Sequence, residues 1–227
     1  MFYNVSKEDD YLFKGKRKRL VEQLRAKGIK NDKVLSAIEK IPRHLFFDST
    51  TSRPALLDHA YSDKALPIGA GQTISHPYTV AFQTEQLEIK PGEKVLEIGT
   101  GCGYQTAVLI EMGAKVYSIE RQKTLFDKTK LFMPFIGYHG VKLIYGDGYK
   151  GLPQYAPFDK IIVTAGAPYI PNDLLMQIKV GGVVLIPIGD GTTQEMVWLK
   201  KTSDLQFDKK VLGSFKFVPL LQNKSGG

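Results

Sequence analysis

The 227-residue sequence contains a single cysteine, Cys102, so the chain can form neither an internal disulfide nor a thiolate metal cluster. It has no apolar run that approaches the roughly 20 residues of a membrane-spanning helix. Its amino terminus also lacks the basic and apolar stretches of a secretory leader. The few histidines show no metal-ligand spacing: His44, His59, His76 and His139. These absences predict a cytoplasmic protein with no disulfide framework, no membrane span and no metal site.

The composition is that of an ordinary globular protein, with 43% apolar and 24% charged residues, which excludes collagen, coiled-coil and wholly disordered chains. The formal net charge is +8, and residues 1–30 carry nine basic and four acidic side chains, so +5 of it lies there. The densest part runs from Lys14 to Arg19. A basic cluster can attract nucleic acid, but Leu20 and Leu24 follow at helical spacing. We therefore interpret the cluster as the solvated face of an amphipathic helix.

The chain divides into a helical first third and a longer part in which strands and helices alternate. Glycine and proline interrupt residues 61–77, which we expect to form an irregular surface segment before a helix that begins near Pro77. The predicted strands are 94–98, 115–120, 141–145, 160–163, 183–187, 196–200 and 211–218. This alternation predicts an α/β fold with a doubly wound, mostly parallel sheet and a helical N-terminal extension. We expect a single structural domain, with residues 1–76 as the extension and active-site loop and 77–227 as the α/β core.

A glycine-rich turn, GTGCG at residues 99–103, follows the predicted strand 94–98 and opens the next helix. Ligands of parallel α/β sheets lie at the carboxyl ends of the strands, and glycine lets the backbone approach a ligand closely. Glu120 ends the next strand about 20 residues later, where a carboxylate can accept hydrogen bonds from both hydroxyls of a ribose. The pattern predicts a nucleotide cofactor held near Gly99, Gly101 and Glu120.

Two cofactor classes fit this outline. The dinucleotide fingerprint is GxGxxG, but Tyr104 occupies the position of its third glycine. Glu97 precedes the turn by two residues, and a carboxylate there would repel a pyrophosphate but suit the ammonium and sulfonium groups of S-adenosylmethionine. Asp147 and Gly148 follow the third strand, where Asp can accept from the adenine amino group or simply form a turn. The residues therefore favour S-adenosylmethionine over NAD.

Motifs along most of the chain extend beyond the cofactor turn. They are IPRHLF at 41–46, GQTISHP at 71–77, LEIGTGCGYQTA at 96–107, GDG at 146–148, APFDKIIVT at 156–164 and FVPL at 217–220. From residue 17 to 220 the chain resembles the protein-L-isoaspartate O-methyltransferase family, and the loop at 71–77 is far more specific to that family than the glycine turn. Three positions depart from the family pattern: Cys102 stands where a Ser is common, Tyr78 where some members have His, and Leu221 where some have Thr.

The resemblance implies a Rossmann-like class I S-adenosylmethionine-dependent methyltransferase with an unusual order of the last two strands. It implies methyl transfer to the α-carboxyl of L-isoaspartyl residues in damaged proteins and peptides, which initiates repair through a succinimide. Ser75 aligns with the family's catalytic, substrate-binding serine, although its spacing alone favours an N-cap of the next helix. The resemblance further implies that Gln72, Thr73 and Ile74 form a wall against the methionine part of the cofactor. Val218 is implied to present its backbone to the substrate.

Two other functions stay open. The basic N-terminus favours an RNA or DNA methyltransferase, but VTAGAP at 163–168 replaces the acidic or Asn-Pro-Pro motif of amino-methylating enzymes. A catalytically inactive cofactor-binding protein is the other alternative, and the intact loop around Ser75 argues against it. The implied partners are isoaspartyl-containing proteins and peptides. We expect no nucleic acid, no membrane and a monomer.

Overall fold

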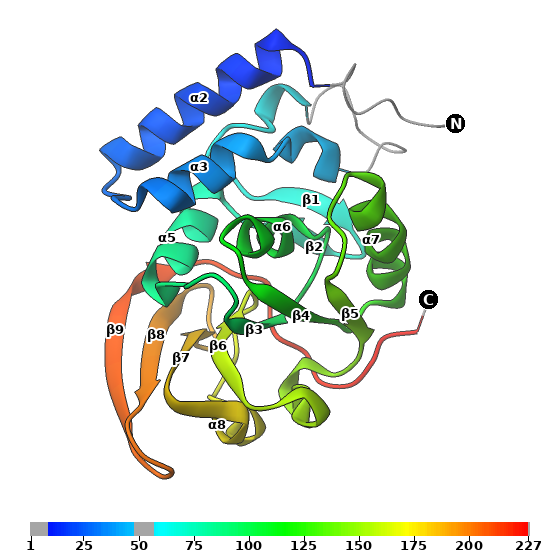
Figure 1. Cartoon of the computed structure of the whole chain (residues 1–227). Coiled ribbons are helices and arrows are strands. Elements are labelled where there is room, and N and C mark those ends of the chain that lie inside the picture. Colours follow the sequence, from blue (N-terminus) through cyan, green and yellow to red (C-terminus); the bar gives the residue numbers. More distant parts are fainter. Residues whose placement is uncertain (1–8, 48–56, 227) are drawn as a thin grey trace.

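The computed structural model describes residues 9–47 and 57–226, which form a seven-stranded sheet with helices on both faces (Figure 1). The α-helices are α2 (Tyr11–Ala26), α3 (Asp32–Lys40), α5 (Pro77–Leu87), α6 (Tyr104–Glu111), α7 (Lys123–Phe135) and α8 (Asn172–Gln177). The strands of the sheet are β3 (Lys94–Ile98), β4 (Lys115–Glu120), β5 (Lys142–Tyr145), β6 (Phe158–Val163), β7 (Ile178–Ile188), β8 (Gln194–Lys201) and β9 (Phe207–Phe215). Short 3-10 helices are η1 (Arg43–Phe46), η2 (Gly148–Lys150) and η3 (Pro153–Tyr155).

The strand order in the sheet is β5-β4-β3-β6-β7-β8-β9. Strands β3 to β7 run parallel, whereas β8 is antiparallel to both of its neighbours. The order reverses between β3 and β6, where Ile98 pairs with Val163, and such a switch point opens a crevice at the carboxyl ends of the strands. The predicted doubly wound, mostly parallel sheet is therefore confirmed. The last two strands follow in chain order, and β9 is an outer edge of the sheet.

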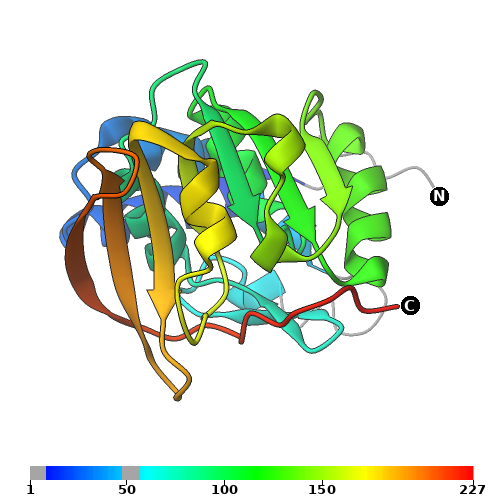
Figure 2. The same ribbon diagram turned by 90° about the horizontal axis from the view of Figure 1, so that it is seen from below.

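Two apolar clusters cover the opposite faces of the sheet. In the first, Leu24 of α2 and Ile38 of α3 belong to the same cluster as Val95 of β3. In the second, Leu174 of α8 packs with Val184 of β7. Figure 2 shows this arrangement from below, with α8 in front of the sheet and α2 and α3 behind it. Because the N-terminal helices share an apolar cluster with the sheet, they are part of the same packed unit.

A small hairpin occupies the segment that the sequence predicted to be irregular. Strands β1 (Leu66–Gly69) and β2 (Gln72–Ile74) pair antiparallel. The residues between them, Ala70 and Gly71, have positive φ angles of 50° and 68°, as in tight turns. The prediction of an irregular segment is thus wrong for these residues, because the proline and the turn glycines conceal the short strands.

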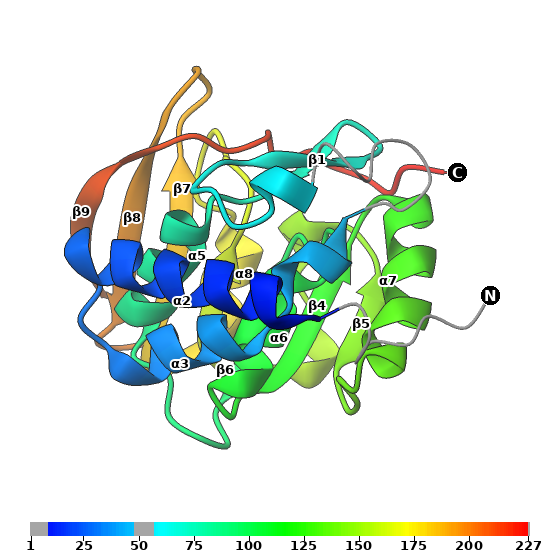
Figure 3. The ribbon, with the colours of Figure 1, turned by 90° about the horizontal axis from the view of Figure 1, so that it is seen from above.

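The C-terminal residues 217–226, which we call the strap, run across the carboxyl ends of the sheet. Strand β9 ends at Phe215, earlier than the predicted 218, and Figure 3 shows the chain then passing beside the hairpin. Pro219 bridges to Gly166 beyond β6, and Ser225 bridges to Gln122 beyond β4. The strap therefore spans the switch point of the sheet.

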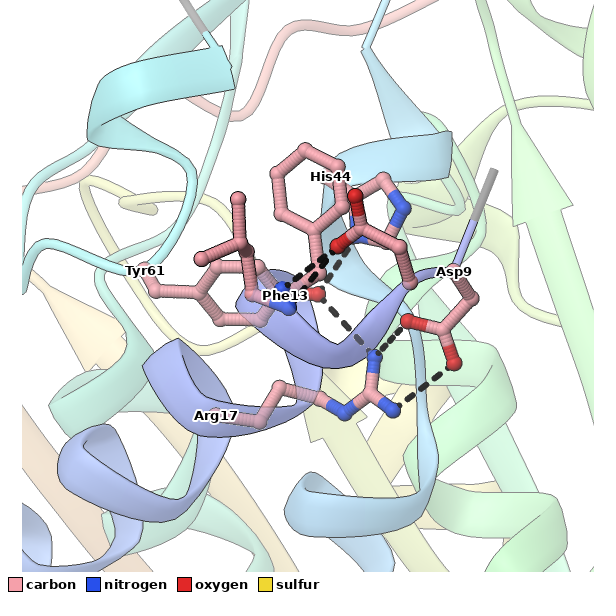
Figure 4. A network of polar contacts seen from close by, with 7 residues as sticks. Asp9, Phe13, Arg17, His44 and Tyr61 are labelled. Carbon is pink, nitrogen blue, oxygen red and sulfur yellow. Dashed lines mark hydrogen bonds and ion pairs between the residues drawn. The ribbon is translucent and has the colours of Figure 1, made fainter. Parts of the chain in front are cut away.

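One side chain of the basic N-terminal stretch is buried. Arg17 is only 5% exposed, and its guanidinium donates to the two carboxylate oxygens of Asp9 at 2.6 and 2.9 Å (Figure 4). It also donates to the hydroxyl of Tyr61 at 3.3 Å, and that hydroxyl lies 2.6 Å from Nδ1 of His44. The interpretation as a solvated face is therefore wrong for Arg17, which anchors α2 to the core. Its neighbours with exposed side chains are Lys14, Lys18 and Arg19.

Candidate functional site

A hollow that is open to solvent lies at the carboxyl ends of β3, β4 and β6. Its walls come from the glycine turn, the end of β4, the hairpin and the strap, and we call it the switch-point cavity. Seven of the residues predicted from the sequence line it: Gln72, Thr73, Gly99, Gly101, Glu120, Gly148 and Val218. Segments that are far apart in the sequence thus meet at one place, as the prediction requires.

The glycine turn presents backbone to the cavity. Gly99, Gly101 and Gly103 have φ angles of 96°, 55° and 88°, in the left-handed region that favours glycine. A Cβ at Gly99 would lie 2.5 Å from Oγ1 of Thr164, and one at Gly103 would lie 2.6 Å from Sδ of Met133. Gly99 and Gly101 line the cavity, whereas the absence of a side chain at Gly103 allows α7 to pack against the turn.

Glu120 places its carboxylate at the cavity, and the residue is 5% exposed. Oε2 accepts a hydrogen bond of 2.8 Å from the backbone nitrogen of Gly101, and Oε1 accepts one of 2.7 Å from that of Gln122. Burial raises the pKa of this carboxyl, and the backbone N–H donors oppose the effect. Each oxygen keeps a second acceptor position. The oriented carboxylate can accept from the two hydroxyls of a ribose.

Glu97 lies beneath the glycine turn and is 0% exposed. Hydroxyls of Thr106 and Ser118 donate to its Oε2 at 2.5 and 2.7 Å, and its Oε1 has no partner among the described residues. Burial raises its pKa to about 7, against the opposing effect of the two hydroxyls. Glu97 is not among the residues that line the switch-point cavity. Its carboxyl joins α6 to β4 below the turn, and its predicted contact with the cofactor's cationic groups stays a prediction.

Asp147 binds the strap. Its Oδ1 accepts from the backbone nitrogen of Tyr149, and its Oδ2 accepts from that of Asn223, both at 2.9 Å. It lines a second, neighbouring hollow together with Tyr149 and Tyr169. These bonds support the turn alternative for Asp147, and its contact with adenine stays a prediction. Gly148, the next residue, lines the switch-point cavity.

The hairpin leads directly into the loop expected to hold substrate. Ile74 is 3% exposed and packs in the first apolar cluster, so its side chain is not a wall of the cavity. Ser75 follows, and α5 begins at Pro77 with His76 as its N-cap residue and no side-chain capping bond. The N-cap alternative for Ser75 is therefore wrong. The Ser75 hydroxyl makes no hydrogen bond with another residue of the described ranges, whereas its carbonyl accepts one of 2.9 Å from Arg43.

Two cavity residues that the sequence reasoning missed stand one position beyond a strand. Thr164 follows β6, and its hydroxyl donates to the carbonyl of Gly99 at 2.7 Å. Arg121 follows β4, and its guanidinium donates to the carbonyls of Asn223 at 2.9 Å and Gln222 at 3.5 Å. Thr164 thus supports the glycine turn, and Arg121 holds the strap. Their place just past strands at the switch point is the signal that identifies them.

Tyr78 and Leu221, two of the departures from the family pattern, lie in different surroundings. The ring of Tyr78 packs with those of Phe82 and Phe215, at centroid distances of 6.0 and 6.5 Å, and Tyr78 is not among the cavity-lining residues. Leu221 lines the cavity and is 45% exposed. A change at Leu221 therefore bears on ligand contacts more directly than one at Tyr78.

The chemistry of the cavity suits an adenosine ligand without phosphate. Among its described lining residues the ionisable side chains are those of Glu120 and Arg121, and Arg121 is bonded to the strap. Ile98, Ile119 and Leu220 provide apolar walls for a purine. No three His, Cys, Asp or Glu side chains of residues 9–47 and 57–226 gather as a metal site, and no helix there is long and apolar enough to cross a membrane. Fold and cavity together define a class I S-adenosylmethionine-dependent methyltransferase.

Comparison with known proteins identifies the family within this class. The family model described as Protein-L-isoaspartate(D-aspartate) O-methyltransferase matches residues 15–225, and the chain belongs to this family. A protein from Christiangramia forsetii named Protein-L-isoaspartate O-methyltransferase is 58% identical over 218 residues, which cover 96% of this chain and 100% of that protein.

Solved structures give the same result. One named protein-L-isoaspartate O-methyltransferase has a TM-score of 0.80 at 30% identity, covering 93% of this chain and 66% of that longer chain. A putative protein-L-isoaspartate O-methyltransferase from Plasmodium falciparum, in complex with S-adenosyl-L-homocysteine, has a TM-score of 0.78 at 26% identity. That alignment covers 91% of this chain and 99% of the other.

Proposed function

We propose that this chain transfers the methyl group of S-adenosylmethionine to the free α-carboxyl of L-isoaspartyl residues in damaged proteins and peptides, and that Ser75 holds this carboxyl. The observation that carries the proposal is that Gln72 and Thr73, just before Ser75, line the same cavity as Gly101 and Glu120. The family of the chain supports the substrate. The S-adenosyl-L-homocysteine bound in the relative from Plasmodium falciparum supports the cofactor.

The residues at the cavity divide the binding of the cofactor between them. Glu120 accepts from the ribose hydroxyls, Gly99 and Gly101 offer close backbone approach, and Gln72 and Thr73 border the methionine part. S-adenosylmethionine, when bound, supplies a methyl group on a positively charged sulfur. The protein's own contribution is to hold the acceptor carboxyl in line with that methyl group and to exclude water from it.

The reaction needs no strong general base, because a carboxylate is already ionised and nucleophilic at neutral pH. The hydroxyl of Ser75 donates to one oxygen of the substrate carboxylate, which leaves the other oxygen to attack. The strap supplies a backbone contact through the N–H of Val218, which makes no hydrogen bond within the described ranges. The carbonyl of Val218 already accepts a hydrogen bond of 2.8 Å from the backbone nitrogen of Gly166. Recognition through backbone would allow many flanking sequences to be accepted, because every peptide carries the same backbone groups.

The direct test incubates the protein with S-adenosylmethionine labelled in its methyl group and with two peptides that differ only in an isoaspartyl or an aspartyl residue. We expect base-labile label on the isoaspartyl peptide alone. Label on neither peptide, or equally on both, contradicts the proposed substrate. Label transferred to RNA instead would favour the nucleic-acid alternative.

The role of Ser75 is tested with Ser75→Ala, and Ser36→Ala on the exposed face of α3 is the matched control. We expect Ser75→Ala to lower kcat by about 10- to 100-fold while affinity for S-adenosylhomocysteine stays within twofold, as for a group that acts on the acceptor. Its Tm should equal that of the control, because the Ser75 side chain caps no helix. Near-normal kcat in Ser75→Ala excludes this role.

We propose, further, that the protein acts as a single-domain monomer without nucleic acid. The N-terminal helices pack in the same apolar cluster as the core, which supports a single domain. Light scattering coupled to gel filtration tests the monomer. A dimer mass at the protein concentration of the assay would contradict it.

A further inference from the structure

Arg43, in η1, has a completely buried guanidinium that binds backbone carbonyls. Its residue is 0% exposed, and Nη2 donates to the carbonyl of Ser75 at 2.9 Å and to that of Lys64 at 3.4 Å. Its Nε donates to the carbonyl of Ala60 at 3.0 Å. No carboxylate of the described residues forms an ion pair with it. Arg43 therefore connects three separate points of the chain ahead of α5.

The guanidinium also contacts the cofactor side of the site. It lies 4.7 Å from the centroid of the Tyr104 ring, and Tyr104 is the first residue of α6, directly after the glycine turn. A cation over an aromatic face is attracted to it. One rigid, planar group thus touches the backbone of the Ser75 loop on one side and the helix after Gly103 on the other.

The energetic cost of this arrangement indicates that it has a role beyond packing. A buried charge without a counter-ion is expensive, and among the described residues only hydrogen bonds and the rings of Tyr104 and Phe47 compensate here, while Nη1 has no hydrogen-bond partner. Burial accordingly lowers the pKa of Arg43, and the electrostatic interaction with Tyr104 opposes that effect. An apolar side chain of similar volume would fill the same space at lower cost. It could not fix the position of three carbonyl oxygens.

A second network holds the segments that Arg43 connects. His44 and Tyr61, the residues after Arg43 and Ala60, meet through the contact of 2.6 Å between Nδ1 and the hydroxyl. Arg17 donates to that hydroxyl, and the ring of Phe13 stacks on His44 at 3.8 Å (Figure 4). Helix α2 therefore fixes the frame within which Arg43 binds the Ser75 loop.

We infer that Arg43 is a positioning residue for methyl transfer, which sets the distance between the Ser75 loop and the cofactor turn through its bonds to the Ser75 carbonyl and its contact with Tyr104. This inference rests on the proposed role of Ser75 in holding the acceptor carboxyl. A displacement of about 1 Å between reacting groups can lower a rate 100-fold. Arg43 acts on kcat without touching substrate or cofactor.

The test is a double-mutant cycle of Arg43→Lys and Ser75→Ala, with Arg25→Lys on the surface of α2 as the matched control. Lysine keeps the charge but lacks the planar fork that reaches several carbonyls. We expect Arg43→Lys to lower kcat about 10- to 100-fold with affinity for S-adenosylhomocysteine within threefold of wild type. In the Ser75→Ala background the same substitution should change kcat less than twofold, because the two residues act as one unit.

Each kcat is calculated from the concentration of S-adenosylhomocysteine-binding sites, which calorimetry measures. Unfolded protein therefore does not lower the kcat. If Arg43→Lys binds no S-adenosylhomocysteine, Arg43→Gln, which removes the buried charge and keeps a planar donor, replaces it in the cycle. A kcat within twofold of wild type overturns the inference, as does an equal loss in both backgrounds. The proposed role of Ser75 fails separately, if Ser75→Ala alone keeps its activity, and the proposed substrate fails separately, if the wild type does not label the isoaspartyl peptide.

Discussion

The backbone nitrogen of Gly101 donates a hydrogen bond of 2.8 Å to Oε2 of Glu120, which joins the glycine turn after β3 to the end of β4. The two elements expected to hold the cofactor are therefore bonded to each other before any ligand arrives. A ligand that uses Glu120 meets a carboxylate whose rotamer the turn already fixes.

Replacement of Glu120 by Gln tests this link. One oxygen becomes an NH₂ group that faces a backbone donor, Gly101 or Gln122, so an acceptor is lost and the turn is disturbed. We expect calorimetry to show a loss of about 1–3 kcal/mol in affinity for S-adenosylhomocysteine. The control is Glu22→Gln on the exposed face of α2. Equal affinity in both variants would remove Glu120 from the cofactor site.

The buried carboxyl of Glu97 makes the stability of the protein depend on pH. Its pKa is about 7 in the folded protein against an ordinary value of 4.5, so the folded state retains a proton that the unfolded chain releases. This contribution to stability is complete below pH 4.5 and is lost as the pH rises through 7. Between pH 5 and 8 we expect a loss of about 2–3 kcal/mol of unfolding free energy from this group.

Urea unfolding of the wild type and of Glu97→Gln at pH 5 and pH 8 isolates the contribution of Glu97 to the unfolding free energy. Glutamine imitates the protonated carboxyl at both pH values. Glu120, whose pKa burial also raises, contributes to both proteins and cancels to first order. The difference in unfolding free energy between the two proteins should shift in favour of Glu97→Gln at pH 8. A difference that does not change with pH would mean that Glu97 is ionised throughout the range.

The strap is expected to slow the exit of the cofactor. Arg121→Ala removes the two donors that bind Asn223 and Gln222, and each such bond contributes about 0.5–1.5 kcal/mol. We expect stopped-flow measurements to show dissociation of S-adenosylhomocysteine accelerated about 5- to 30-fold. Arg19→Ala, on the exposed surface of α2, should dissociate at the wild-type rate.

A variant that ends at residue 221 distinguishes two explanations for a fast dissociation in Arg121→Ala. Either the loss of the bonds to the strap accelerates the release of S-adenosylhomocysteine, or Arg121 itself contacts this ligand. The truncated variant should reproduce the fast dissociation of Arg121→Ala. If only Arg121→Ala is fast, the guanidinium contacts the ligand itself.

The basic stretch on α2 contains two kinds of side chain, and they should respond differently to substitution. Arg17→Met leaves Asp9 without its partner and should cost about 2–3 kcal/mol of stability, somewhat less than a fully buried pair because Asp9 is partly exposed. Neutral substitutions at Lys14 and Lys18 should leave stability and methylation within error. Thermal unfolding and the peptide assay measure both. RNA binding by the wild type that depends on salt and is lost in the Lys14 and Lys18 variants would contradict the interpretation of these lysines as a solvated helix face.

The sequence predicted those parts of the structure in which a local pattern determines the outcome. Alternating strands and helices after Gly92 predicted the sheet, and the turn with Glu120 predicted one wall of the cavity. The face of β3 on which the Glu97 side chain lies could also have been predicted from the sequence. Val95 and Glu97 share one face of β3, because side chains alternate along a strand, and that face lies under the helices of the first apolar cluster.

The remainder of the site depends on contacts between distant segments, which no local pattern encodes. Arg43 binds carbonyls that lie 17, 21 and 32 residues further along the chain, and Asp147 meets Asn223 across 76 residues. Carbonyl acceptors exist at every position, so side-chain identity does not show which ones an arginine will reach. The hairpin was missed for a related reason, since strands this short give little alternation to detect.

Strand β9 bears on how the protein meets its own substrates. Damaged and partly unfolded chains offer unpaired backbone that can add to the open edge of a sheet, which leads to aggregation. The edge strand β9 carries three consecutive exposed charged residues, Asp208, Lys209 and Lys210. Charges of this kind discourage a foreign strand from pairing there. These charges therefore disfavour co-aggregation of the enzyme with the aged chains on which it acts.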